Sequence, residues 1–290
     1  MYRFILFALF ILNITTTSLQ AAETSHHVLV SVAPHKFFVD KIAGDTVTVG
    51  LMVPAGASSH TFEPTPKQML VASTADLWFC IGESFEARAS RSLIAHNPKL
   101  RLIDLRKNVD MITADPQSGC SCCHASSQDL HIWLSARQAK IQATTIAQTL
   151  SERYPEHTQR YQKALENFTK ELDDLDSQLT QILRPIKGQT ILVSHPAYAY
   201  FCRDYQLKQL SIEFEGKDPA PQQLNMILNI AREAHIKKVF TQMQYSNKGA
   251  KLFAKELNAA IVVLDPYAED YLNTMLYIGQ QFASQDTQSP

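Results

Sequence analysis

The sequence predicts an α/β protein of two lobes, each with a mainly parallel sheet and flanking helices, joined by one long rigid helix. Short runs rich in β-branched residues alternate with helical patterns in both halves of the chain, an order that favours parallel strands with crossover helices. The length of 290 residues suggests two domains, at roughly 150 residues each. A sustained helical stripe of apolar residues separates the halves, and it indicates a stiff connection between them.

The N-terminus has the pattern of a secretory signal over residues 1–22. Arg3 supplies a positive charge, residues 4–12 are unbroken apolar, and the small residues Ala21 and Ala22 follow a polar stretch. The apolar run is about half of the ~20 residues that a membrane-spanning helix needs, although an N-terminal membrane anchor remains the alternative. No cysteine near this segment could carry a lipid. We therefore expect an exported, soluble chain that begins near Glu23.

The first lobe is expected to span residues 23–153. Its strands are runs rich in branched and aromatic side chains, which are typical of buried strands. They are predicted at residues 27–33, 46–53, 75–81 and 100–104, with a helix over residues 66–73.

A long helical stretch follows. Ser135 is a candidate N-cap for a helix that runs to about Arg153, and Pro155 suits the first turn of the next helix. The second helix shows an apolar stripe with alternating spacings of four and three residues, at Tyr161, Leu165, Phe168, Leu172, Leu175, Leu179 and Ile182. This pattern could mark a short coiled coil, but we favour a linker helix over residues 154–185 that packs one face along both lobes. Its length would be roughly 45 Å.

The second lobe is expected over residues 186–290, with the same alternation of strand and helix. Its strands are predicted at residues 190–193, 209–214, 238–241 and 260–264.

The composition and the missing motifs exclude several classes of function. A formal net charge of -1 argues against nucleic-acid binding. The sequence contains no HExxH, no GxSxG and no GxxxxGK[ST], so we expect no enzyme, and any ATPase must be a separate chain.

Four separated residues could form a metal site. His60, His131, His195 and Asp265 all fall on expected loops, two of them directly after a strand pattern, and ligands of open α/β sheets bind at the carboxyl ends of strands. Three imidazoles and one carboxylate form a plausible ligand set for Zn²⁺. Histidines beside apolar runs are more often packed or surface residues, so the pattern alone leaves both interpretations open.

Several segments resemble a known family. HTFEPTP, DLHIWLS, SHPAYAYFCRDY and LDPYAEDYLNTM, in this order, are similar to the cluster A-I (ZnuA/TroA-like) solute-binding proteins of zinc and manganese ABC importers. The resemblance spans nearly all of the mature chain, although Leu130 stands where the family usually has proline. It implies two α/β lobes joined by a long helix, with metal bound between the lobes.

The resemblance also implies a function and a ligand set. The family's ligand positions fall on His60, His131, His195 and Asp265, and the implied role is a periplasmic, monomeric protein that delivers metal to an ABC permease with its own ATPase subunit. Manganese-selective members tend to carry a carboxylate where His195 stands here, so we favour Zn²⁺, with Mn²⁺ or a broader divalent metal as the alternative. Glu63 and Asp129 are candidates to support the ligating histidines from behind. A charge at the N-terminus of the following helix is an equal alternative for Glu63, and for Asp129 we favour the role of a turn or cap residue.

Residues 115–128 are expected to form an exposed loop, and they contain closely spaced cysteines. Cys120, Cys122, Cys123 and His124 could form an auxiliary metal site. We favour thiols that form disulfides in an oxidising compartment.

Two functions from other classes stay open. A zinc hydrolase would need an open coordination position on the metal and a Glu or Asp that acts as general base. Glu63 is the candidate for that base. Some relatives are described as surface adhesins, but the missing lipid-anchor cysteine argues against surface display.

Overall fold

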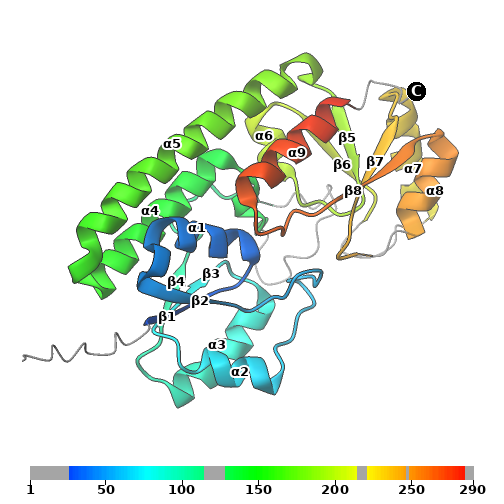
Figure 1. Ribbon diagram of the computed structural model, residues 1–290. Helices are drawn as coiled ribbons and strands as arrows, with labels where there is room; N and C mark the ends of the chain where they lie inside the picture. The colour runs from blue at the N-terminus through cyan, green and yellow to red at the C-terminus, as the bar shows by residue number, and fades with distance from the viewer. Residues whose placement is uncertain (1–25, 114–127, 214–220, 246–247, 285–290) are drawn as a thin grey trace, which may run out of the picture.

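A computed structural model describes residues 26–113, 128–213, 221–245 and 248–284. They form two lobes, each built on a four-stranded parallel sheet, with one long helix running beside both (Figure 1). The predicted fold class is confirmed. Two predictions lie outside the described residues: the signal segment over residues 1–22, and the loop expected to contain Cys120, Cys122, Cys123 and His124.

The first lobe has the sheet order β2-β1-β3-β4. Val28 in the central strand β1 pairs with Val49 on one side and Leu77 on the other. The elements are β1 (His26–Val30), α1 (Ala33–Ala43), η1 (Gly44–Thr46), β2 (Val47–Leu51), α2 (Pro66–Ala72), β3 (Leu77–Cys80), α3 (Ser84–His96) and β4 (Arg101–Asp104).

The second lobe repeats this topology with the order β6-β5-β7-β8. Strand β6 ends at Ser211, three residues before the predicted end at Phe214. The elements are β5 (Thr190–Val193), α6 (Ala199–Asp204), β6 (Lys208–Ser211), α7 (Pro221–Glu233), β7 (Lys238–Gln242), α8 (Lys248–Leu257), β8 (Ala260–Leu264) and α9 (Tyr271–Ala283).

Two helices connect the sheets, α4 (Ala136–Arg153) and α5 (Thr158–Leu183), and the short helical turns η3 (Pro155–His157) and η4 (Arg184–Ile186) flank α5. The Ser135 hydroxyl accepts a hydrogen bond from the Gln138 backbone N–H, which is the predicted N-cap of α4. The 26 residues of α5 span about 39 Å. Its buried side chains are Tyr161, Phe168, Leu172, Leu175, Leu179 and Leu183, largely the predicted stripe.

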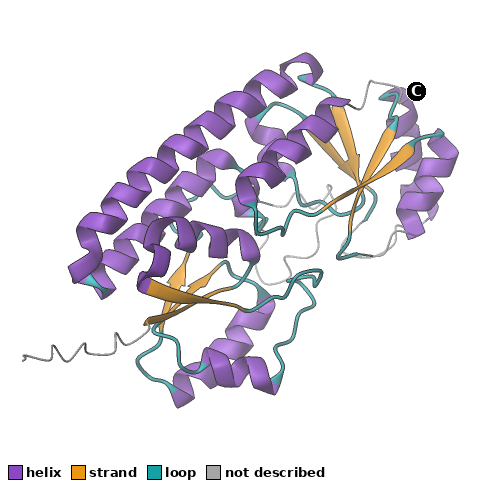
Figure 2. Ribbon diagram, in the orientation of Figure 1, coloured by secondary structure: helices purple, strands orange, loops and turns teal. Residues whose placement is uncertain are grey.

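Helices cover both faces of each sheet (Figure 2). One hydrophobic core runs through the molecule, because the buried stripe of α5 packs on α1 and α4 beside the first sheet and on α9 beside the second. Two smaller cores fill the outer faces, one under α2 and α3 and the other under α7 and α8. The shared core keeps the two lobes in a fixed relation, as expected for a helical linker.

A buried histidine holds the turn η2 (Ile132–Leu134) that follows His131. The His35 ring on α1 is fully buried, and its Nε2 lies 2.6 Å from the Gln142 Oε1 atom on α4. The amide of Gln142 in turn donates to the Ile132 carbonyl oxygen at 3.0 Å. Burial lowers the pKa of His35 to about 4, so the ring is neutral and donates to Gln142.

This buried histidine predicts a pH dependence of stability. The unfolded chain binds a proton at His35 below pH 6.5, whereas the folded chain does so only near pH 4, so stability is lost as the pH falls through this window. Urea unfolding of the metal-free protein at pH 7 and pH 5 should show that His35→Gln loses about 2 kcal/mol less than the wild type over this step. His96→Gln removes an exposed histidine and should follow the wild type; equal losses in all three proteins would contradict the assignment.

Candidate metal centre

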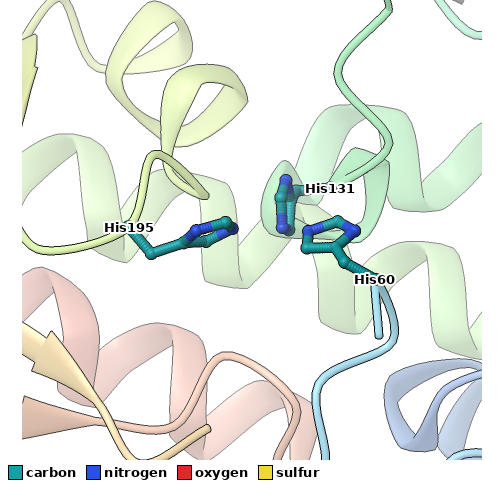
Figure 3. A group of neighbouring side chains, drawn as sticks. All are labelled: His60, His131 and His195. Atoms are coloured by element: carbon teal, nitrogen blue, oxygen red, sulfur yellow. The ribbon is translucent and has the colours of Figure 1, made fainter. Parts of the chain in front are cut away.

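Three histidines from distant segments meet between the two sheets. His60 lies between β2 and α2, His131 directly precedes η2, and His195 follows β5 (Figure 3). One ring nitrogen of each lies within 4.8 Å of those of the other two. Ring centroids are separated by 5.2 to 5.4 Å, and His131 and His195 are each 1% exposed. Three predicted residues are thus brought together.

Each histidine has a carboxylate behind it. The Nδ1 atom of His60 lies 3.1 Å from Glu83, that of His131 lies 2.8 Å from Asp129, and that of His195 lies 2.9 Å from Glu213. A carboxylate at this distance fixes the tautomer, because Nδ1 then carries the proton and Nε2 keeps its lone pair. The three Nε2 atoms are therefore the donors that the site offers to a cation.

The electrostatics of the site favour a neutral His195 and an ionised Glu83. Burial, with repulsion from His60 and His131, holds the pKa of His195 well below its ordinary value. Burial alone would raise the pKa of Glu83, but His60 and Ser59 outweigh it, and the net pKa lies below the ordinary value. The Nε2 atoms of His131 and His195 are buried without a hydrogen-bond partner among the described residues. Burying such acceptors is costly, so the group fits a bound cation.

Strand register explains how His195 meets its carboxylate. Val193 at the end of β5 pairs with Ser211 at the end of β6. The same register continues beyond both strands, because the Glu213 N–H donates to the Ser194 carbonyl oxygen at 3.0 Å. His195 and Glu213 are each two residues past these paired ends, so neighbouring parallel strands deliver them side by side.

The segment carrying His60 has no regular structure between β2 and α2. The Val53 N–H at its start donates to the Ser31 carbonyl oxygen, and at its end Thr65 and Gln68 form a reciprocal capping box. Glu83, which follows β3, accepts a hydrogen bond from the Ser59 hydroxyl at 2.7 Å besides its contact with His60. The sheet and α2 thus fix the two ends of the segment, while Glu83 holds the histidine itself.

Asp265 directly follows β8 but is not part of the three-histidine group among the described residues. Its Oδ1 atom accepts hydrogen bonds from the Gln244 side-chain amide at 2.6 Å and from the Tyr267 N–H at 3.0 Å. The same oxygen takes both bonds, so neither of them engages Oδ2. The predicted fourth ligand therefore stays a prediction.

The two residues expected behind the histidines have different positions. Asp129 lies behind His131, and its Oδ1 also accepts from the His131 backbone N–H at 2.9 Å. Glu63 does not support a histidine: its carboxylate pairs with Arg88 at 2.8 Å, and its side chain is 74% exposed. Only two residues separate it from His60, and the extended, proline-containing segment there directs it to the surface.

Glu83 and Glu213 are the site residues that the sequence analysis missed. Both are acidic residues just beyond the carboxyl end of a strand, in the same setting as the histidines. The predicted strand over residues 209–214 placed Glu213 inside regular structure, whereas the strand ends before it. An acidic residue shortly after each strand is the signal that could have found them.

The fold and the site together define a two-lobed binding protein whose cargo is a metal ion. The family described as "Zinc-uptake complex component A periplasmic" (ZnuA) matches residues 28–285. A putative metal-binding protein of Chlamydia trachomatis is 33% identical over 97% of this chain and 99% of its own length. A crystal structure of ZnuA shows a TM-score of 0.84 at 35% identity, covering 91% of this chain and 100% of its own. The manganese ABC transporter substrate-binding lipoprotein PsaA of Streptococcus anginosus is 25% identical over 92% of this chain and 90% of its own.

This chain belongs to the ZnuA family. It is the substrate-binding component of a metal ABC importer and not an enzyme. Across the described ranges, none of the helices combines the length and apolarity needed to cross a bilayer.

The carboxylate behind His60 gives a direct test of the site. Glu83→Gln removes the charge that orients this imidazole and makes it more basic, so Zn²⁺ affinity should fall about 10- to 100-fold, as is usual for such outer partners. Calorimetric titration of the stripped protein measures the change. Glu63→Gln, the matched control at the surface, should bind Zn²⁺ like the wild type. Equal effects of the two variants would show that Glu83 has no special role.

Proposed function

We propose that the chain is a periplasmic, monomeric Zn²⁺-binding protein, exported through a cleavable signal over residues 1–22, that delivers its ion to an ABC permease with a separate ATPase subunit. The observation that carries the proposal is the buried group of His60, His131 and His195, each backed by a carboxylate. Capture requires only that the neutral imidazoles donate their Nε2 lone pairs. Only coordination bonds to the ion form and break, and no covalent chemistry is needed.

The donor set supports zinc. Imidazole is a good ligand for Zn²⁺, and three protein nitrogens with one further ligand complete the tetrahedron that this ion prefers. We assign the fourth position to Asp265, because Tyr267, two residues later, hydrogen-bonds to Ser59 next to His60. The Oδ2 atom of Asp265 is not engaged by Gln244 or Tyr267. The general affinity order of divalent ions also places Zn²⁺ well above Mn²⁺.

Manganese is the second candidate substrate. The similarity to the manganese-binding PsaA and the carboxylate of Asp265 favour it, because carboxylate oxygen suits the harder Mn²⁺. The three imidazoles weigh against Mn²⁺, because imidazole nitrogen suits Zn²⁺ better. The histidines therefore favour one ion and the carboxylate of Asp265 the other.

Metal competition distinguishes the two ions. Residues 23–290, stripped with chelator, should bind one Zn²⁺ per chain tightly in a calorimetric titration, and excess Mn²⁺ should not displace it, because the site is rich in imidazole. Mass spectrometry of the loaded protein checks the stoichiometry. Preferential binding of Mn²⁺ would establish the second candidate, and two tight Zn²⁺ per chain would assign a second site to Cys120, Cys122, Cys123 and His124.

Single substitutions rank the ligands. His60→Ala, His131→Ala and His195→Ala should each weaken Zn²⁺ binding more than Asp265→Ala, because each removes a donor from the histidine group while Asp265 only completes it. The loss for each histidine should exceed the ~10- to 100-fold typical of an outer partner. The same titration applies. An Asp265→Ala loss larger than all three histidine losses would refute the ranking.

A further inference from the structure

Two tyrosines of the second lobe contact the segment that carries His60. The Ser58 hydroxyl donates to the Tyr245 phenol oxygen at 3.1 Å, and the Ser59 and Tyr267 hydroxyls lie 3.0 Å apart. Tyr245 follows β7 and Tyr267 follows β8, whereas both serines directly precede His60. Each hydrogen bond therefore joins the two lobes, next to a residue of the histidine group.

Tyr245 also contacts the histidines through its ring. It stacks on His195 with centroids 4.0 Å apart and planes inclined by 14°. Its centroid lies 6.4 Å from that of His60. Tyr245 is partly exposed, while His195 is buried. One side chain thus covers an imidazole of the second lobe and binds the segment that holds an imidazole of the first.

Tyr267 extends the same contact into the interior. It is buried, and its hydroxyl is the one that hydrogen-bonds to Ser59. The Ser59 hydroxyl lies within reach of Glu83, the carboxylate behind His60. Hydrogen bonds therefore lead from Tyr267 through Ser59 and Glu83 to the His60 ring. The bond between Ser58 and Tyr245 joins the same segment to the second lobe at a separate point.

We infer that Tyr245 and Tyr267, together with Ser58 and Ser59, form a tyrosine bridge that positions His60 and slows release of the metal. The inference rests on the proposed function. Beyond Val53, the segment between β2 and α2 pairs with none of the described strands, so no β-sheet hydrogen bonds hold it in place there. Its side-chain contacts therefore decide how firmly His60 is positioned. Release requires His60 to leave the ion, and movement of its segment must break the bond between Ser58 and Tyr245.

The paired variants Tyr245→Phe and Ser58→Ala test the bridge. Tyr245→Phe keeps the ring on His195 and loses only the hydroxyl. In stopped-flow transfer of Zn²⁺ to a chelator, each variant should raise the dissociation rate about 3- to 10-fold, the range that one hydrogen bond supplies. The association rate should change little. The double variant should be no faster than the faster single variant, because both remove the same bond.

Matched controls remove similar groups elsewhere. Tyr277→Phe on α9 and Ser177→Ala on α5 alter exposed residues, and both should release Zn²⁺ like the wild type. Wild-type release rates in Tyr245→Phe and Ser58→Ala, or additive effects in the double variant, would overturn the bridge.

Hydrogen exchange tests the bridge without a metal. In the metal-free protein, Tyr245→Phe and Ser58→Ala should speed amide exchange over residues 54–65 and leave α3 unchanged. Unchanged exchange over residues 54–65 would overturn the bridge. A wild type that binds neither Zn²⁺ nor Mn²⁺ tightly would overturn the proposed function, and the exchange result would still decide the bridge.

Discussion

The hydrogen bond from the Trp133 indole N–H to the Pro266 carbonyl oxygen, 2.8 Å long, fixes where the two lobes meet. Trp133 is fully buried, so its N–H must find a partner in the protein, and losing that partner would cost about 1–3 kcal/mol. The carbonyl oxygen of Trp133 in turn accepts a hydrogen bond from the hydroxyl of Tyr271, at the start of α9. His131 lies two residues before Trp133, and Asp265 directly precedes Pro266. The spacing between the histidine group and the proposed fourth ligand therefore depends on this tryptophan.

The three carboxylates behind the histidines allow charge compensation and metal selectivity to be set by different residues. The charge of a divalent ion needs compensation, whereas the choice between ions depends on the atoms that touch it. Here Glu83, Asp129 and Glu213 supply negative charge at the Nδ1 atom of each imidazole, across the ring from the Nε2 atom that would bind the ion. The atoms that bind the ion can then be mostly nitrogen, because the outer carboxylates balance the ion's positive charge. Exchanging an imidazole for a carboxylate would alter selectivity, and exchanging an outer carboxylate would chiefly alter affinity.

Much of this arrangement is readable from the sequence. The stripe on α5, the cap at Ser135 and the eight strands of the described residues follow from local periodicity and turn chemistry, which act over a few residues. The positions of His60 and His195 follow from the rule that ligands bind at the carboxyl ends of parallel strands. His131 precedes η2 and directly follows none of the described strands, so its place beside them is implied only by the family resemblance. Glu63 and Glu83 show the limit. Both are acidic and near expected elements, but only backbone direction in the segments after β2 and β3 decides which one faces His60. That direction depends on packing between lobes, which local sequence does not encode.

The shared core along α5 constrains how an ion can leave. Because one face of this helix packs on α1 and α4 and also on α9, a wide hinge between the lobes would expose buried side chains such as Phe168 and Leu179. Each such side chain contributes roughly 1.5–3 kcal/mol through burial, so opening the core is far more costly than moving a loop. Of the three histidine segments, His131 is tied to Trp133 and His195 continues a central strand, whereas His60 lies on a segment without regular structure. We therefore expect release to require the least free energy through the His60 segment, where a few side-chain hydrogen bonds, and not the core, would set the barrier.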